Sequence, residues 1–241
     1  MKIMGAGIQI MKNDEIILTG GRMTQGVVKK GDHVLRPLCT NSGFVHKVLE
    51  WLEYSNVSVS SRFIGISDDG REITSFLEGD SPDNLGWFND DQLYEAGKII
   101  KILHSALCNF PGCSINQTVC HNDLSPCNFM FKNGLPYAVF DWDAADINDP
   151  LNDLAYASWM WCDIGNDEYT PAEIGRKIKV ILDAYQLHKD HRYLLTEKMH
   201  EQIQRVSKSH LAINNHATTL WANKCDFWLE QNQNQVTRYF I

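Results

Sequence analysis

The chain has 241 residues, of which 44% are hydrophobic and 22% charged, and its formal net charge at pH 7 is −8. This composition is typical of a globular protein and excludes a disordered, collagen-like or disulfide-dense chain. The excess of acidic residues disfavours nucleic acid as a partner, because phosphate binding needs a basic surface. We see no signal peptide and no apolar run that could span a bilayer, so we expect a cytoplasmic protein without a membrane partner.

The first third of the chain predicts short strands around one helix. We expect strands over residues 15–19, 27–28, 34–38, 63–66 and 72–77. Apolar residues spaced three and four apart predict a helix over residues 44–53, with Asn41 or Ser42 as its N-cap. The polar segment 78–84, which contains Gly79 and a proline, favours a boundary between two lobes, residues 1–78 and residues 79–241.

The second part of the chain is mainly helical in its patterning. Leu93, Ala96, Ile100 and Leu103 repeat at spacings of three and four, which predicts an amphipathic helix after Asn89. Further helical stretches follow residue 150. The segment between these helices carries the candidate chemistry.

A β-hairpin is predicted where Asn133-Gly134 separates two apolar runs, residues 128–132 and 135–140. Asn-Gly is the strongest two-residue hairpin signal, because both central positions need positive φ. The open end of this hairpin therefore brings together the residues that begin the first strand and follow the second.

Two candidate metal ligands lie at that open end. In a regular ladder Asn128 faces Val139, and Asp141 lies about one pair beyond, where diagonal neighbours are about 7–8 Å apart. An amide oxygen and a carboxylate are hard ligands that suit Mg²⁺. The hairpin therefore predicts a Mg²⁺ site formed by Asn128 and Asp141.

The segment before the hairpin has the pattern H-x-D with an asparagine five residues after the aspartate, namely His121, Asp123 and Asn128. In phosphoryl transfer such an aspartate orients the acceptor hydroxyl and such an asparagine holds a metal ion. The next carboxylate along the chain, Asp141, would help to link metal ions to the phosphates. This ordered set predicts a phosphotransferase.

These residues resemble the aminoglycoside phosphotransferase-like enzymes, which are small-molecule kinases with a bilobal protein-kinase-like fold. The resemblance is densest over residues 120–128, 140–143 and 149–155. It implies an α+β fold in which an N-terminal antiparallel sheet with one helix precedes a mainly helical lobe that contains the catalytic hairpin.

The resemblance implies a role for each candidate residue of the C-terminal lobe. Asp123 would be the catalytic aspartate, and His121 would brace its loop. Asn128 and Asp141 would hold Mg²⁺, while Asp153 would support the loop by hydrogen bonds without binding metal. The candidates for contact with the acceptor or a metal-bound water are Asp143, Trp159 and Trp161.

In the N-terminal lobe the resemblance implies a site for ATP or GTP. The candidates for a loop over the phosphates are Gly20, Gly21, Thr24 and Gly26. Arg36 stands where related kinases have a phosphate-binding lysine, and an arginine can bind phosphate bidentately. The position of its usual glutamate partner carries His46, which leaves the partner of Arg36 open. The hinge that would meet the purine edge consists of Ser75, Phe76 and Leu77.

The function implied is Mg²⁺-dependent transfer of the γ-phosphate of ATP or GTP to a hydroxyl of a small molecule. Residues 133–175 contain nine acidic residues and no lysine or arginine, which favours a cationic acceptor such as an aminoglycoside. Choline/ethanolamine-, ketosamine- and macrolide-type kinases are alternatives with the same catalytic residues. A non-catalytic nucleotide-binding protein of the immunity type is another, and the oligomeric state stays open.

Overall fold

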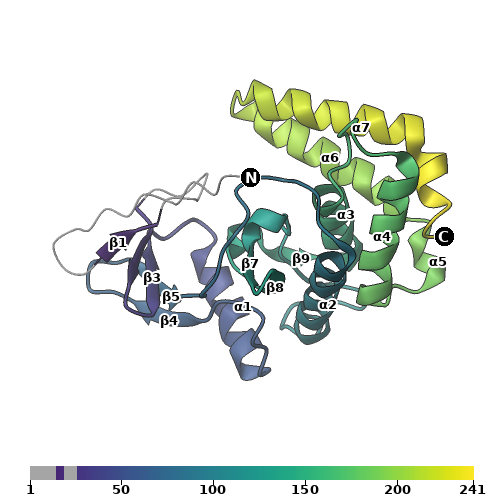
Figure 1. The fold of residues 1–241 in the computed structure, drawn as a ribbon. Helices are drawn as coiled ribbons and strands as arrows, with labels where there is room; N and C mark the ends of the chain where they lie inside the picture. The colour runs from purple at the N-terminus through teal and green to yellow at the C-terminus, as the bar shows by residue number, and fades with distance from the viewer. Residues whose placement is uncertain (1–14, 19–25) are drawn as a thin grey trace.

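An antiparallel sheet and a mainly helical part, with a short β-hairpin between them, make up the computed structural model of the chain (Figure 1). The structure describes residues 15–18 and 26–241. The sheet comes first in the chain and the helices follow, so the predicted α+β class is confirmed.

The N-terminal sheet has five antiparallel strands in the order β1-β2-β3-β5-β4. The strands are β1 (Glu15–Ile17), β2 (Val28–Lys30), β3 (His33–Arg36), β4 (Phe63–Ile66) and β5 (Glu72–Ser75). Strand β3 ends at Arg36, earlier than predicted, where Pro37 follows and cannot donate a ladder hydrogen bond. The register of β3 and β5 places Arg36 directly opposite Glu72.

Helix α1 (Ser42–Tyr54) covers the predicted helical region, but the side chain of its N-cap residue, Asn41, does not cap the helix. The side chain of Asn41 makes no capping hydrogen bond. Its amide nitrogen donates instead to the carbonyl oxygens of Asp143 and Ala145, at 3.0 and 2.9 Å. The start of α1 is therefore tied to the segment that follows the hairpin.

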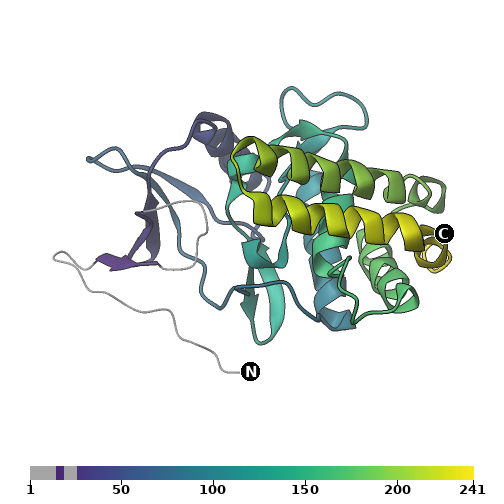
Figure 2. The same ribbon diagram turned by 90° about the horizontal axis from the view of Figure 1, so that it is seen from above.

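The helical part is built around α2 (Asp90–Leu107), whose predicted start at Asn89 carries a capping box with Gln92. The further helices are α3 (Pro150–Trp161), α4 (Pro171–Tyr185), α5 (Lys189–Arg192), α6 (Leu195–Ala212) and α7 (His216–Thr237). Helices α6 and α7 run side by side at the outer edge, as both views show (Figures 1 and 2). Among the described residues no helix is long and apolar enough to cross a membrane.

Two small antiparallel sheets lie between the N-terminal sheet and the helices. One pairs β6 (Thr118–Cys120) with β9 (Asp146–Asn148), and the other is the hairpin of β7 (Phe129–Lys132) and β8 (Leu135–Val139). The hairpin turn has positive φ at both central residues, 54° at Asn133 and 80° at Gly134, as the sequence predicts.

A bulge shifts the register of the hairpin beside Pro136, which has no N–H to give to the ladder. Because of it, Val139 pairs with Phe129, and the predicted pairing of Val139 with Asn128 is wrong by one residue. The carbonyl of Asn128 instead accepts the N–H of Phe140 at 3.1 Å. Asn128 therefore lies one pair nearer than expected to the aspartate that follows β8.

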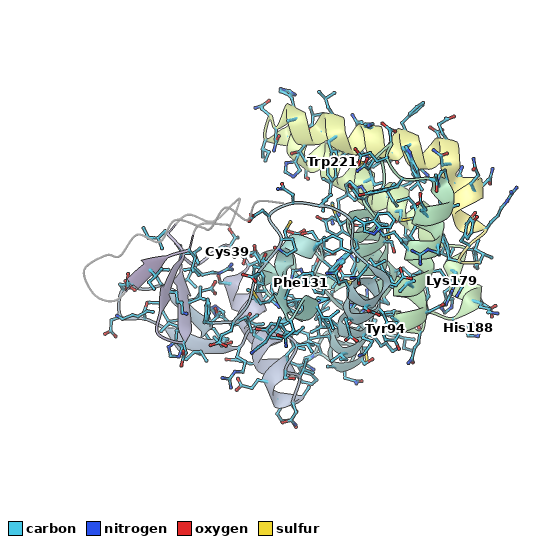
Figure 3. The ribbon with its side chains drawn as sticks, in the orientation of Figure 1. Cys39, Tyr94, Phe131, Lys179, His188 and Trp221 are labelled. Atoms are coloured by element: carbon cyan, nitrogen blue, oxygen red, sulfur yellow. The ribbon has the colours of Figure 1, made fainter. Side chains whose placement is uncertain are left out.

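The segment that links the sheet to the helices is fastened to this hairpin. Asp80 and Phe131 exchange two main-chain hydrogen bonds of 3.1 and 2.8 Å, and the Tyr137 hydroxyl donates to the Glu78 carbonyl at 2.8 Å. Gly79 has φ 143°, and a Cβ there would lie 2.1 Å from the carbonyl oxygen of Phe131. Only glycine fits this close approach to Phe131, which Figure 3 shows between the sheet and the helices.

Candidate active site

The loop of residues 121–128 is supported from beneath by Asp153, a carboxylate on α3 that is 1% exposed. One of its oxygens accepts the N–H of His121 and the other accepts the N–H of Asn122, both at 2.7 Å. The Nε2 of His104 lies 3.0 Å from the first oxygen. Asp153 thus makes the loop-supporting contacts that the resemblance implies.

These contacts keep the buried Asp153 ionised. Burial alone would raise its pKa, but the hydrogen bond and the charge of His104, the charge of His121 and the His121 N–H outweigh it. The pKa of Asp153 is therefore held below its ordinary value. A charged acceptor strengthens each hydrogen bond from the loop.

Asp153 also belongs to a buried group of three metal-type ligands, with His104 and Cys120. Its carboxylate is engaged by the loop, and the Cys120 thiol lies 3.3 Å from the Asp149 carbonyl that accepts its hydrogen bond. Burial, with the negative charge of Asp153, raises the pKa of the thiol, so it stays protonated. We assign this group to loop support.

His121 connects the loop to the hairpin. The residue is 1% exposed, its Nε2 lies 3.0 Å from the carbonyl oxygen of Phe140, and its ring centroid lies 4.6 Å from that of Trp142. These contacts are those of a bracing residue. His121 therefore does not face a substrate.

Asp123 is the candidate catalytic group, and it is held through both its main chain and its side chain. Its carbonyl oxygen accepts Nδ2 of Asn128 at 2.8 Å, and its Oδ1 accepts the hydroxyl of Tyr156 at 2.7 Å. The first contact occupies the amide nitrogen of Asn128. The amide oxygen is then the atom that Asn128 offers to a metal ion, which is what Mg²⁺ binding requires.

Asp141, the second candidate metal ligand, lies two residues after the end of the hairpin strand β8. It has φ 65° and ψ 64°, a left-handed conformation that costs a non-glycine residue about 1 kcal/mol. Such strain persists where surrounding structure enforces it, and it is frequent at functional sites. The side chain is 38% exposed, so a ligand can reach it.

Arg36 binds three carboxylates at once. Its Nε pairs with Glu72, its Nη1 lies 3.1 Å from Asp141 Oδ1, and its Nη2 pairs with Asp143. The other oxygen of Glu72 lies 2.7 Å from Nε2 of His46. The partner that the sequence left open is therefore Glu72, a strand residue, which also contacts the histidine at the usual glutamate position.

The role of Glu72 is not predicted from the sequence, because it depends on burial and on strand order. Glu72 is 2% exposed in the structure, and a buried glutamate needs a cation nearby. The antiparallel pairing of β3 with β5 supplies Arg36. Burial would lower the pKa of Arg36, but Glu72, Asp143 and Asp141 hold it above its ordinary value, so the guanidinium stays charged.

The nucleotide candidates are placed only in part. Gly20, Gly21 and Thr24 lie outside the described residues. Gly26 has φ 82°, beside Pro37. In the hinge, the Ser75 N–H donates to the Arg62 carbonyl and the Phe76 N–H to the Asp32 carbonyl, each at 2.9 Å. Those two N–H groups are engaged within the sheet, so neither is available to the purine edge that the resemblance implies.

Trp159 and Trp161 do not line an acceptor site, and the expectation that they would contact the acceptor is wrong. Both are 0% exposed. Trp161 donates its indole N–H to the carbonyl of Leu124 at 3.1 Å, and Trp159 stacks on Trp221 of α7, with centroids 4.9 Å apart. Figure 3 shows Trp221 among the side chains beneath α7. Both rings are core residues because α3 is buried on almost every side.

The acidic residues of 133–175 are distributed over local structural tasks. Asp149 and Glu173 cap the first turns of α3 and α4, and Asp167 pairs with a lysine of α7. A cation, Arg205 of α6, lies against the loop of residues 121–128, where its Nη2 donates to the Asn122 carbonyl at 3.1 Å. These contacts give no support to a single acidic rim around the acceptor.

Comparison with known proteins agrees with this geometry. Residues 111–186, which contain the loop and the hairpin, match the model of the phosphotransferase enzyme family. A trifolitoxin immunity protein of Rhizobium leguminosarum bv. trifolii is 27% identical in an alignment that covers 87% of this chain and 91% of that protein.

Two solved kinases share the fold. An amicoumacin kinase superposes with a TM-score of 0.65 at 10% identity, covering 91% of this chain and 87% of its own. An aminoglycoside 2′-phosphotransferase-IIIa superposes with a TM-score of 0.57 at 13% identity, covering 95% and 93%. At this identity the likeness shows the fold alone, and it confirms that the fold is protein-kinase-like.

Proposed function

We propose that this chain, whose residues 111–186 match the model of the phosphotransferase enzyme family, transfers the γ-phosphate of ATP or GTP to a hydroxyl of a small molecule. The observation that best supports the proposal is the joint placement of Asp123, Asn128 and Asp141. The amide nitrogen of Asn128 binds the carbonyl of Asp123, and its own carbonyl accepts the N–H of Phe140, the residue before Asp141. Asp141 in turn pairs with Arg36.

In this proposal the nucleotide phosphates lie between Arg36 and the hairpin. Asn128 and Asp141 would hold Mg²⁺, which when bound offsets the charge that develops on the transferred phosphoryl group. Arg36 would release Asp141 and Asp143 and bind phosphate oxygens, while Glu72 keeps the guanidinium in place. The cation is thus already present where phosphate charge would arrive.

Asp123 would accept the hydrogen bond of the acceptor hydroxyl and align its oxygen for in-line attack on the γ-phosphorus. The new O–P bond forms as the bond to the β-phosphate oxygen breaks, and the hydroxyl proton passes to the Asp123 carboxylate. The support for this role is the fixed position of the Asp123 side chain and carbonyl in the loop. Positioning and charge stabilisation supply most of the rate in such reactions.

The test of the reaction is Asp123→Ala. We expect turnover to fall by about 10²–10⁴-fold, because the group that orients the hydroxyl is lost, while nucleotide affinity changes little. Transfer of radiolabelled γ-phosphate and calorimetric nucleotide titration measure the two quantities. Turnover close to that of the wild type would contradict the role of Asp123.

For the acceptor, we propose a hydroxylated small molecule of the aminoglycoside kind. The support is the fold shared with kinases whose names specify aminoglycosides and amicoumacin. A panel of aminoglycosides, macrolides and amino alcohols with both Mg-ATP and Mg-GTP decides it. Stabilisation of the protein on heating, which reports ligand binding by linkage, ranks the panel before turnover is measured.

A second candidate function is favoured by the relative that is 27% identical and is a trifolitoxin immunity protein. In that case the chain protects its cell from a toxin, either by phosphorylating it or by binding it. A protection assay in cells that carry wild type or Asp123→Ala separates the two. Loss of protection in the variant indicates phosphorylation, and full protection indicates immunity without catalysis.

A further inference from the structure

Tyr156 on α3 contacts the candidate catalytic group directly, and neither the sequence patterns nor the resemblance points to it. Its hydroxyl donates a hydrogen bond of 2.7 Å to Oδ1 of Asp123. Asp153, which supports the loop main chain, lies three residues earlier on the same helix face. One face of α3 therefore binds both the main chain of the loop, through Asp153, and the side chain of Asp123, through Tyr156.

The hydroxyl of Tyr156 is in surroundings that keep it protonated, so it remains a hydrogen-bond donor to Asp123. Burial, together with the charge and the hydrogen bond of Asp123, raises the pKa of Tyr156 well above its ordinary value. The hydroxyl is therefore protonated at every pH at which the protein would work. A donor facing a carboxylate makes a charge-assisted hydrogen bond, which is stronger than a neutral one.

The ring of Tyr156 is itself held in place. It is 8% exposed and meets the ring of Trp159 edge-on, with centroids 5.8 Å apart. The guanidinium of Arg205 makes a second contact and lies 6.0 Å from the centroid of the Tyr156 ring. Arg205 also binds the loop carbonyl of Asn122, so α3 and α6 together enclose the tyrosine beside the loop.

We propose that Tyr156 is the positioning residue for Asp123. By binding Oδ1, the tyrosine hydroxyl fixes the Asp123 carboxylate in one rotamer and leaves Oδ2 to the acceptor hydroxyl. This inference rests on the proposed phosphotransferase function. A carboxylate on a single-bonded side chain otherwise samples several rotamers, and only some of them can align the hydroxyl. Tyr156 would therefore act on turnover and not on nucleotide binding.

The first test is Tyr156→Phe, which removes the hydroxyl and keeps the buried ring. We expect kcat to fall about 10-fold, while the KM and the Kd for nucleotide change by less than about twofold. The matched control is Tyr137→Phe, which loses a phenol hydrogen bond of 2.8 Å to the Glu78 carbonyl, away from Asp123. We expect its kcat to stay within about twofold of the wild type. An unchanged kcat in Tyr156→Phe overturns the inference.

The second test is a pair of crystal structures, wild type and Tyr156→Phe, which needs no turnover. We expect one rotamer of Asp123 in the wild type and a displaced or multiple rotamer in the variant. A variant that loses kcat with Asp123 unmoved would overturn the inference. A wild type that transfers phosphate to no acceptor overturns the proposed function, while the two structures still decide whether Tyr156 positions Asp123.

Discussion

The two halves of the candidate site hold their polar groups in different ways. In the loop half, Asp153 and His121 are each 1% exposed and bind groups of the protein's own main chain. In the Arg36 half, Asp141 and Asp143 are 38% and 31% exposed and are paired with the arginine. In the proposed function the loop half is therefore prepared in advance, whereas the Arg36 half would exchange partners when a nucleotide binds.

The energies of these contacts follow from their exposure. Asp141 and Asp143 are partly exposed, so in the proposed function a phosphate group can reach Arg36 and take their place. Loss of a hydrogen bond to a buried charge costs about 1.5–3 kcal/mol. Glu72 is 2% exposed and lies on the buried side of Arg36, so it keeps the guanidinium near the site during the exchange.

The largest effect is expected for Asp153→Asn, which tests whether the loop half is prepared by this carboxylate. The Asp153 carboxylate accepts the N–H groups of His121 and Asn122 with its two oxygens. An asparagine amide is uncharged and has only one oxygen, so it cannot replace both contacts. We expect the free energy of unfolding to fall by about 3 kcal/mol and turnover to fall about 100-fold. Urea denaturation and phosphate transfer measure these changes. The control is Asp149→Asn, since asparagine caps a helix as well as aspartate does.

The pH dependence of stability gives an independent check on Asp153. Its pKa is lower in the folded than in the unfolded protein, so its contribution is complete above the unfolded value of about 4 and is lost as the pH falls through the folded value. When the pH is lowered from neutral to this acidic range, the free energy of unfolding should fall more for the wild type than for Asp153→Asn. Parallel curves for the two proteins would show that Asp153 does not carry this stability.

The next largest effect concerns Asp141→Asn in the Arg36 half. If Asp141 changes partner from Arg36 to Mg²⁺, the variant should lose about 100-fold in nucleotide affinity when Mg²⁺ is present. In buffer with a chelator the variant should bind nucleotide at least as tightly as the wild type, because Asp141 then only competes with phosphate for Arg36. Calorimetric titration under both conditions measures the difference. An equal loss with and without Mg²⁺ would assign Asp141 to general folding of the site.

A smaller effect is expected for Glu72→Gln, which tests what anchors Arg36. Without the negative charge the guanidinium is no longer held from its buried side, and we expect nucleotide affinity to fall about 10-fold. His46→Gln is the control, because it alters the 2.7 Å contact between His46 and Glu72 and the stacking of His46 on Phe63 but leaves the charge of Glu72 in place. If the two variants lost affinity equally, the histidine and not the glutamate would be the anchor.

The smallest effect, and one of opposite sign, is expected for Asp143→Asn. This carboxylate competes with phosphate for Arg36, so its removal should tighten binding of metal-free nucleotide about threefold. The measurement is a titration of nucleotide in chelator. Weaker binding would show that Asp143 helps to hold the nucleotide and does not compete with it.

Local signals predicted most of the fold. The Asn-Gly turn, the start of a helix after Asn89 and the apolar spacing of α2 are all found where the sequence predicts them. The register of the hairpin is off by one residue because a single proline introduces a bulge, and an alternating pattern does not show a bulge. Bulges of this kind are a frequent source of error beside functional sites.

Contacts between distant segments were harder to predict. Glu72 meets Arg36 only through the order of strands in the sheet, and Tyr156 meets Asp123 only through the packing of α3 against the loop. Trp159 and Trp161 were misassigned because a helix buried on nearly all sides shows no exposed face in its sequence. Each of these depends on tertiary packing, which one sequence does not specify locally.

The central claim is that the loop half is preformed and the Arg36 half exchanges partners. A crystal structure with Mg²⁺ and a non-hydrolysable nucleotide tests it most directly. We expect Arg36 to have left Asp141 and Asp143 for the phosphates, Asp141 to bind the metal, and the contacts of Asp153 and Tyr156 to be unchanged. Arg36 still paired with Asp141 beside a bound nucleotide, or a loop with new partners, would contradict the account.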